Sequence, residues 1–525
     1  MEKLKARFDT LHAERSEIMN RKRKTAALSQ VDVLPPENWE ENDKLPDSYQ
    51  SLGAFGTSNI ASSFTMAMFP VGTPWLSLKI NEKLAQSFKL EEDGEEALEE
   101  LRGDLSLDDQ VIMRTLEETN LRSLANNVLE HEIVVGQSLF RGNAGSDKEP
   151  MSFEMWPLDS YVCRRTPAGK PLEVIIHELK DPLELTDAQL EVIGKTKDEL
   201  DSLGQRDRMQ HLYTRAVWNA DGTLTETQEI EDKPLSQKSY QVPPYFLPSW
   251  RMSARGNYPR GLIEQNMGDL RSFDGLQKSI LEATIAAAKV VFLVNPSGVT
   301  RKKQIVDAKN LAVLYGRPDD VHVIQVNKHA DMSVALQTSK SIEDRLGRAM
   351  LLFLAARRDA ERVTAKEIGE TVRELEGVTG GSFSSQAVGW LQPLAKWVVW
   401  VLAKKKKTIL AYLSDETIDG MMDIEILTGV AALTKESELQ KDLSTMQILS
   451  QMPGMPEILK MANIARRILR HRGQDEADFV KSNDEIAEDK AADQAEAQQA
   501  QIQQAAAGKA IDVIGNAAQE EILTQ

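Results

Sequence analysis

The residues best suited to chemistry in this chain do not form a complete catalytic motif. His131-Glu132 begins the zinc-protease pattern His-Glu-x-x-His, but the second histidine is missing. The other histidines are scattered along the chain, at His12, His177, His211, His322, His329 and His471. Acidic pairs such as Asp319-Asp320 are frequent, and acids of this kind could serve a metal-dependent nuclease with two ions. Their spacing does not place two of them around one substrate, so the nuclease is kept as a minor alternative.

Motifs for phosphate binding and for nucleophilic catalysis are absent as well. Gly377 to Ser382 is glycine-rich, but it lacks the lysine of a P-loop and follows a predicted helix instead of a strand. No Gly-x-Ser-x-Gly elbow occurs. The sequence therefore predicts a protein that is not an enzyme and that holds no cofactor and no metal ion.

Net charge and cysteine content exclude further classes of protein. The 525 residues carry a formal net charge of −18, with Cys163 as the single cysteine. Proteins that grip nucleic acid through its phosphates are usually basic, so this charge predicts repulsion or weak contact with DNA. One cysteine permits neither an internal disulfide nor a cysteine metal cluster. An apolar run of about 18 residues and a signal-peptide core are both missing, which predicts no membrane span and no secretion.

Two long helices around a short β segment dominate the middle of the chain. Apolar periodicity predicts one helix from about Leu262 to about Lys289 and a second over Ser341 to Arg357. Three short β runs lie between them, over Val290–Val294, Ala312–Tyr315 and Val321–Val326. The order predicts a helical stalk with a small β tip.

The remaining segments predict an α+β fold that is mainly helical. Helices are expected over residues 1–28, 48–69, 110–132, 185–203 and 384–413, and hairpins around Pro167-Ala168-Gly169 and around Asn219 to Gly222. In the last helix, a stripe with Trp390 and Trp397 predicts core packing. The first helix is amphipathic and basic, which suits nucleic acid, an anionic membrane or, as the favoured reading, a neighbouring subunit.

Several short stretches keep an order and spacing that occur together in one protein family. They are Tyr258 to Leu270, Val294-Asn295-Pro296-Ser297-Gly298, Gly316-Arg317-Pro318, and Glu361 to Ile368 with Gly380-Gly381, preceded by Gly53-Ala54-Phe55-Gly56 through Phe69-Pro70. From about residue 45 to about residue 430 the chain thus resembles the portal proteins, the head-to-tail connectors of short-tailed, podovirus-type bacteriophages.

The resemblance implies a portal-type fold that assembles into a ring. Its parts are the wing (1–260), a stem helix (261–290), the clip (291–340), a second stem helix (341–358), a tunnel loop with wing helices (359–430) and a helical crown (431–525). The Ala/Gln-rich piece near residues 484–507 is a candidate helical barrel, and a disordered tail is the alternative.

The resemblance also implies the function and the partners. A ring, usually of twelve subunits, stands at one capsid vertex of the virion and passes double-stranded DNA without sequence specificity during packaging and ejection. It docks the terminase large subunit and later a tail adaptor, and it contacts the major capsid protein and scaffold. Assembly in the host cytoplasm, away from any membrane, is expected. Another structural phage protein, a tail adaptor or a scaffold, is the runner-up.

Two groups of cations are the candidate site residues. The resemblance directs Arg357, Arg358 and Arg362 toward the channel, where a few cations would position the duplex without reading bases. Ion pairs of these arginines with Asp359 or Glu361 are the alternative. On the clip, the cations that could meet a motor or an adaptor are Arg301, Lys302, Lys303, Arg317 and Lys328, and a solvated surface is the competing interpretation.

Overall fold

The computed structural model describes residues 3–70, 74–81, 85–86, 94–204, 208–252, 256–288, 291–308, 312–324, 329–352, 385–405, 407–408 and 422–426. The chain divides into two compact units, Met1–Leu433 and Thr434–Gln525, and all described residues belong to the first. The predicted crown and its candidate barrel therefore lie outside the described residues.

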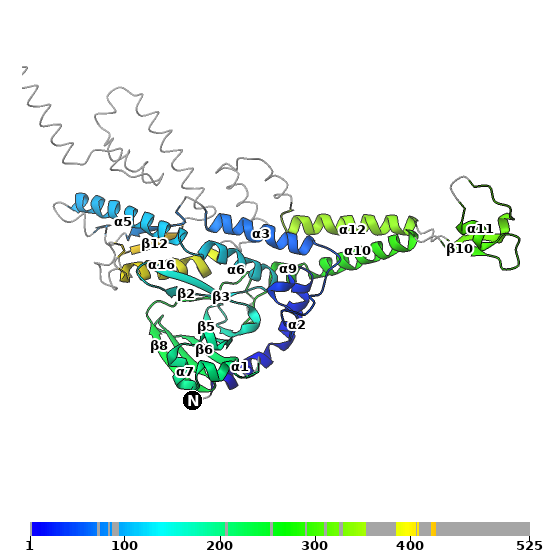
Figure 1. Ribbon diagram of the computed structural model, residues 1–525. Coiled ribbons are helices and arrows are strands. Elements are labelled where there is room, and N and C mark those ends of the chain that lie inside the picture. The colour runs from blue at the N-terminus through cyan, green and yellow to red at the C-terminus, as the bar shows by residue number, and fades with distance from the viewer. Residues whose placement is uncertain are drawn as a thin grey trace, which may run out of the picture. The chain divides into compact units, whose positions relative to one another are not determined.

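A five-stranded antiparallel sheet forms the lower part of Figure 1. Its strands, in spatial order, are β4 (Tyr161–Arg165), β5 (Pro171–Lys180), β6 (Gln210–Trp218), β7 (Leu224–Ile230) and β8 (Lys233–Tyr240). Both predicted hairpins are confirmed, because β4 pairs with β5 and β6 pairs with β7. The last strand, β8, was not predicted.

The N-terminal segment forms two helices, α1 (Leu4–Glu14) and α2 (Ser16–Ala27), where one was predicted. The apolar face of α1 packs on this chain's own five-stranded sheet, in a cluster of Leu4, Phe8, Leu11, Val162, Ile175 and Tyr213. The favoured reading, that this face lies on a neighbouring subunit, is therefore wrong. The same apolar spacing suits either surface, and only the tertiary structure distinguishes them.

The other face of the five-stranded sheet turns toward a three-stranded sheet. That sheet has the order β3-β2-β9 and contains β2 (Leu139–Ala144), β3 (Met151–Trp156) and β9 (Tyr245–Phe246). Two short helices, α7 (Asp187–Ile193) and α8 (Lys197–Asp201), replace the single helix predicted over residues 185–203. The break follows from Gly194, which takes a φ of +77° and ends α7.

The main core lies among helices and the three-stranded sheet. Its helices are α3 (Leu52–Met68), α5 (Gly94–Glu117), α6 (Leu121–Val135) and α16 (Gln392–Lys404). Trp390 and Trp397 are buried there, which confirms the predicted core stripe. A π-helical turn, η5 (Ala387–Leu391), precedes Pro393. Proline cannot donate the usual bond to the carbonyl four residues earlier, so a wider turn at this point is expected.

The predicted long helix divides into α9 (Leu262–Gln265) and α10 (Met267–Ala288). At the break, the Asn266 side-chain amide donates to the carbonyl oxygen of Leu262 at 2.9 Å. The next long helix, α12 (His329–Ala349), begins twelve residues before the predicted Ser341 and ends before the predicted Arg357. A short strand pair, β1 (Leu76–Ile80) with β12 (Met422–Ile426), joins distant parts of the chain and was not predicted.

Helices α10 and α12 lie side by side and run antiparallel (Figure 1). Polar side-chain contacts join them. Arg345 donates from Nε and Nη2 to the two carboxylate oxygens of Asp269, at 3.2 and 2.9 Å. Two turns along, the Gln277 amide donates to Ser339 Oγ at 3.2 Å. Leu270 and Leu346 are fully buried in this helix pair. The apolar contacts supply attraction, and the bidentate ion pair fixes the register.

A buried ion pair joins α2 to α9 beside the carboxyl end of α6. The Lys22 ammonium donates to the carbonyl oxygens of Val135 and Pro259, and it lies 3.5 Å from the Glu264 carboxylate. Burial lowers the pKa of Lys22 to about 8, and the charge of Glu264 opposes that shift. The backbone at residue 261 lies very close to the end of α6, because a Cβ there would be only 2.4 Å from the carbonyl oxygen of Ile133. Glycine at position 261 is therefore required.

Replacing Lys22 by Met should lower the free energy of unfolding by about 3 kcal/mol, because it removes the buried ammonium beside Glu264 Oε2 and the donor to the carbonyls of Val135 and Pro259, while Arg21 and Arg260 still hold Oε1 at 2.7 and 3.1 Å. Guanidinium denaturation at pH 7 measures the change. Lys24→Met is the matched control, since Lys24 is exposed on the same helix and should change stability by less than about 0.5 kcal/mol. Equal effects of the two substitutions would contradict a structural role for the buried pair.

A second buried carboxylate, Glu132 of α6, faces the helix that contains η5. The Gln386 amide donates to Glu132 Oε2, whereas Oε1 has no hydrogen-bond partner. Burial raises the pKa of Glu132 to about 8, although Gln386 and the charge of Arg165 oppose the shift. The folded chain therefore holds this proton between about pH 4.5 and 8, where the unfolded chain has released it, and the contribution of Glu132 to stability falls as the pH rises through that window.

Glu132→Gln should remove this pH dependence, because an amide keeps the shape and does not titrate. The difference in thermal midpoint between Glu132→Gln and the unsubstituted chain should grow in favour of the variant from pH 5 to pH 8. Glu117→Gln, at an exposed position of α5, should follow the unsubstituted chain at every pH. Parallel curves for Glu132→Gln and the unsubstituted chain would mean that Glu132 titrates normally.

Candidate docking and channel surfaces

The predicted channel cations cannot be placed from this structure. Arg357, Arg358 and Arg362 lie outside the described residues, and so does Lys328 of the predicted clip set. Their assigned roles remain predictions. The other four cations, Arg301, Lys302, Lys303 and Arg317, lie in the segment between α10 and α12, whose described residues over 291–324 are called the tip module below.

The tip module is built on two antiparallel strands. β10 (Val291–Val294) pairs with β11 (Val321–Ile324), so two of the three predicted β runs are confirmed. The third, over Ala312–Tyr315, is not a strand. A short helix, α11 (Lys302–Val306), lies between the two strands in the chain and was not predicted.

Asp320 holds the loop of the tip module in place. Its Oδ2 accepts hydrogen bonds from the backbone N–H groups of Val299 and Thr300, at 2.9 and 3.1 Å, and from the Thr300 hydroxyl at 3.1 Å. The bond from the Thr300 backbone is the main cause that lowers the pKa of Asp320. A Cβ at residue 298 would lie 2.4 Å from Asp320 Oδ1, so glycine is needed there. Asp320 thus has a structural role in holding this loop.

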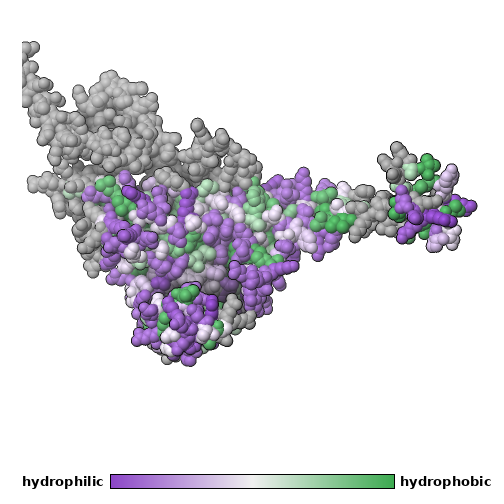
Figure 2. All heavy atoms as spheres, viewed as in Figure 1, coloured by the Kyte–Doolittle hydropathy of each residue, from purple (hydrophilic) through white to green (hydrophobic). Residues whose placement is uncertain are grey.

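Cations and large apolar side chains share the surface of the tip module. Arg301, Lys302, Lys303 and Arg317 are all exposed. Six apolar side chains are exposed beside them in the sequence, namely Leu293, Val299, Val306, Val313, Leu314 and Tyr315. Figure 2 shows hydrophobic and hydrophilic residues together on this module. Val313 is 89% exposed and Tyr315 is 87% exposed, which is unusual for residues of this size and marks a contact surface.

The prediction missed these apolar residues because it placed Val313 and Tyr315 in a strand. An apolar run before Gly316 has the composition of a half-buried strand. Whether such a run is buried depends on pairing with another strand, and residues 312–315 pair with neither β10 nor β11. The apolar run itself was the signal that could have indicated a contact surface.

The helix pair also exposes large apolar side chains. Leu281 and Ile285 on α10 and Leu336 on α12 are about half exposed, and Val334 on α12 is 65% exposed. All four lie toward the ends of the helices that adjoin the tip module in the chain, away from the Asp269–Arg345 ion pair. This part of the helix pair therefore presents an apolar surface that the described residues do not cover.

A strained turn follows α12, just before the segment that contains the predicted channel arginines. Leu351 has a φ of +55°, in the left-handed region that side chains other than Gly seldom adopt. The Asn59 side chain of α3 donates to the carbonyl oxygens of both Met350 and Leu351, at 3.3 Å each. Strain of about 1–3 kcal/mol persists only where the surroundings hold the turn, and here Asn59 and the burial of Leu351 do so.

The histidines are less scattered in space than in sequence. His177 Nε2 and His211 Nδ1 lie 2.8 Å apart on neighbouring strands, and Phe8 stacks on His12 and contacts His177. Within the described ranges, no three His, Cys, Asp or Glu residues are arranged to hold a metal ion. Among those same residues, no helix has the length and apolar character that crossing a membrane requires.

The chain matches one protein family over most of its length. The family described as bacteriophage head to tail connecting protein matches residues 1–478. The portal proteins of Enterobacteria phage T3 and Escherichia phage T7 are each 28% identical to it, over 92% of this chain and 88% of their own. The portal protein of Pseudomonas phage phiKMV is 25% identical, over 83% of this chain and 84% of its own. The chain therefore belongs to the bacteriophage head-to-tail connecting protein family, as the resemblance had predicted.

Proposed function

We propose that copies of this chain, twelve as in the family, close into a ring whose channel passes double-stranded DNA into a phage capsid and out again. The observation that carries the proposal is the match to the portal proteins of T3 and T7 over 92% of the chain. The exposed apolar side chains of α10 and α12 support it, because side-by-side contact with a second copy would bury them.

In this proposal the predicted parts keep their roles, with one adjusted boundary. Residues 1–260 form the wing, 261–290 the first stem helix, 359–430 the tunnel loop with wing helices and 431–525 the crown. The second stem helix starts at His329, where α12 begins, so the clip is reduced to the segment before it. Electron microscopy of the purified protein tests the ring directly, since particles without a central hole would overturn it.

The net charge of −18 supports passage of DNA without capture. Each phosphate neutralised by a cation adds affinity, so an acidic wall shortens the time that the duplex stays bound. Arg357, Arg358 and Arg362 are proposed to steady the duplex at the narrowest point of the channel. The turn at Leu351, which Asn59 holds in its strained conformation, would fix the position from which the segment with these arginines begins.

Replacing Arg357, Arg358 and Arg362 together by Ala should leave the rings intact and reduce DNA retention in filled heads. The reason is that the substitutions remove the cations beside the duplex without changing the apolar contacts between subunits. Counting rings by electron microscopy and packaged DNA by nuclease protection measures both. Loss of the rings would mean that these arginines stabilise the subunit contact and do not face the channel.

The tip module is proposed to dock the terminase large subunit and, after packaging, a tail adaptor. Its exposed cations suit an acidic partner surface, and its exposed Val313 and Tyr315 supply apolar area for the same contact. The wing is proposed to contact the major capsid protein and scaffold within the virion. These partners follow from the family, and the mixed surface of the module supports the first two.

Reversing Arg301, Lys302 and Lys303 to Glu should weaken terminase binding by roughly tenfold or more and increase its sensitivity to salt, because three attractive charges become repulsive. Pull-down or interferometry at two salt concentrations measures the effect. A matched variant reverses Lys170, Lys195 and Lys238, which are exposed in the wing, and should bind normally. Equal weakening in both variants would show an effect of net charge alone.

The alternatives differ in what purified protein does. The family is one of structural proteins, so plasmid DNA incubated with the protein and magnesium or manganese should remain intact, whereas a metal-dependent nuclease would cut it. A tail adaptor or scaffold would bind pre-formed heads or coat protein without nucleating a ring of its own.

A further inference from the structure

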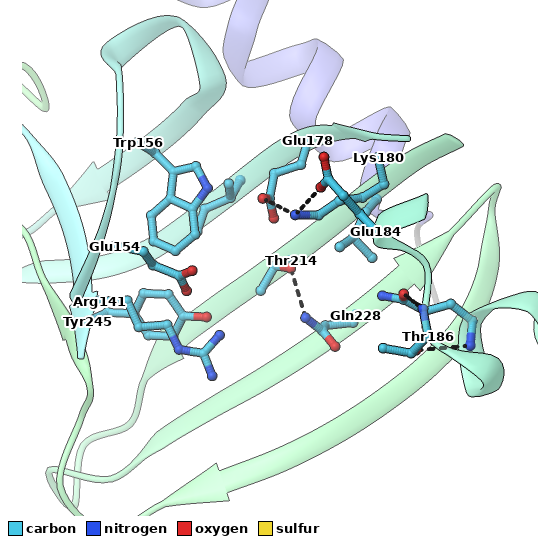
Figure 3. A pocket seen from close by; sticks show the side chains of 13 residues that line it. Arg141, Glu154, Trp156, Glu178, Lys180, Glu184, Thr186, Thr214, Gln228 and Tyr245 are labelled. Atoms are coloured by element: carbon cyan, nitrogen blue, oxygen red, sulfur yellow. Dashed lines mark hydrogen bonds and ion pairs between the residues drawn. The ribbon is translucent and has the colours of Figure 1, made fainter. Parts of the chain in front are cut away.

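A polar cleft of about 210 Å³ lies between the two β-sheets of the wing (Figure 3). β2, β3 and β9 contribute Arg141, Glu154, Trp156 and Tyr245 to one wall. The five-stranded sheet forms the floor with Thr214 and Gln228, and residues around η3 (Pro182–Glu184) and α7 close one end. The space is smaller than the roughly 300–1,000 Å³ typical of cofactor sites, so it suits a group of side-chain size.

Most polar groups of the cleft are already paired with one another. Lys180 Nζ lies 3.0 Å from Glu178 and 3.4 Å from Glu184. Burial disfavours the charge of Lys180, but these two carboxylates outweigh it and raise the pKa of the ammonium. On the floor, the Gln228 amide donates to the Thr214 hydroxyl at 3.1 Å. These pairs shape the cleft and leave no free cation among them for an anionic ligand.

The opposite wall already holds one guanidinium. Arg141 lies over the Tyr245 ring, with its Cζ 5.1 Å from the ring centroid, and its Nη2 is 3.4 Å from the buried Glu226 carboxylate. Tyr245 donates its hydroxyl hydrogen to the same glutamate at 2.6 Å. An aromatic ring beside a carboxylate is the arrangement that stabilises a desolvated cation. The Arg141 guanidinium of the chain itself thus shows that this wall can hold a cation of this type.

Glu154 is the lining carboxylate whose charge acts on Arg141 only through space, where it helps to raise the pKa of the guanidinium. It lies directly opposite Arg141 in the pairing of β2 with β3, where opposite charges ordinarily attract each other. Arg141 turns instead to Glu226, and Glu154 makes no hydrogen bond or ion pair with the part of the chain that the structure describes. Trp156, two residues along the same face of β3, is half-buried, with its ring centroid 6.5 Å from that of Tyr245. An exposed carboxylate and a second aromatic ring therefore border the remaining space.

We propose that this cleft binds an alkylguanidinium or alkylammonium group, with its charge at Glu154 and its alkyl stem against Trp156. The lining residues include three glutamates against two cations, and Glu226 adds a further negative charge beneath them. The group is carried either by a free amine or by an arginine or lysine of a second copy of this chain. The proposal does not depend on a DNA channel.

Calorimetric titration of the full chain with butylguanidine, and with butylurea as its neutral counterpart, tests the ligand class. Butylguanidine should bind saturably and butylurea should not. Glu154→Gln should weaken binding by roughly tenfold, since a charge-assisted hydrogen bond is lost, and Trp156→Leu should weaken it severalfold. Glu154→Asp, which keeps the charge, should bind butylguanidine more tightly than Glu154→Gln does. If both variants lose binding equally, the loss comes from misfolding and not from the missing charge.

Glu149→Gln is the matched control, because it removes one exposed charge outside the cleft. Equal weakening in Glu149→Gln and Glu154→Gln, or equal binding of the two ligands, would overturn the proposal. Sedimentation then identifies the source of the cation. If Glu154→Gln weakens self-association and butylguanidine competes with it, the source is a second copy; if assembly is unchanged while butylguanidine binds, the source is a free amine. Rings can fail to form while the cleft still binds, so the two proposals fail separately.

Discussion

The arrangement of the helices depends on a buried charge pair, Lys22 with Glu264, where three elements of the chain converge. The Lys22 ammonium meets the last carbonyl of α6 and the carbonyl of Pro259, and Glu264 brings the first turn of α9 against it. Removing two charges from water costs several kcal/mol, and this pair persists because carbonyl oxygens accept the remaining hydrogen bonds of the ammonium. The backbone before α9 lies against the last carbonyls of α6, which is why residue 261 must be glycine. From this point α2 leads toward the β-sheets and α9 leads into the long helix pair.

The parts of the fold that the sequence could predict are those set by local pattern. Hairpins with a glycine at the turn, such as those at Gly169 and Gly222, are local, and both were predicted correctly. The core stripe with Trp390 and Trp397 follows from helical period alone. The break at Asn266 was missed, because a side chain that bonds its own helix backbone leaves little trace in apolar spacing. The start of α12 at His329 was missed because the prediction began the helix only at Ser341.

Long-range pairing accounts for the larger errors. The partner of β1 lies more than 300 residues later in the chain, at β12, and no local pattern reports it. Ala312–Tyr315 has the composition of a strand and yet is exposed, and it does not join the sheet that β10 forms with β11. For the candidate surfaces, the sequence located the cations of the tip module, but the apolar half of that surface became visible only with the fold. The cleft at Glu154 was not predicted at all, since its walls come from two sheets that meet only in the folded chain.

The five-stranded sheet shows how one element serves two purposes. Alternate residues along β5 point to opposite faces, so Ile175 packs under α1 while Ile176, Glu178 and Lys180 face the cleft. A one-residue slip in the pairing of β5 would exchange these sets, placing charges under α1 and apolar side chains in the cleft. The ion pair between Arg7 of α1 and Glu173 of β5, at 3.1 Å, helps to exclude that slip, because it ties the helix to one register. Docking of α1 therefore determines what the opposite face presents, and the polarity of the cleft depends on a helix that does not touch it.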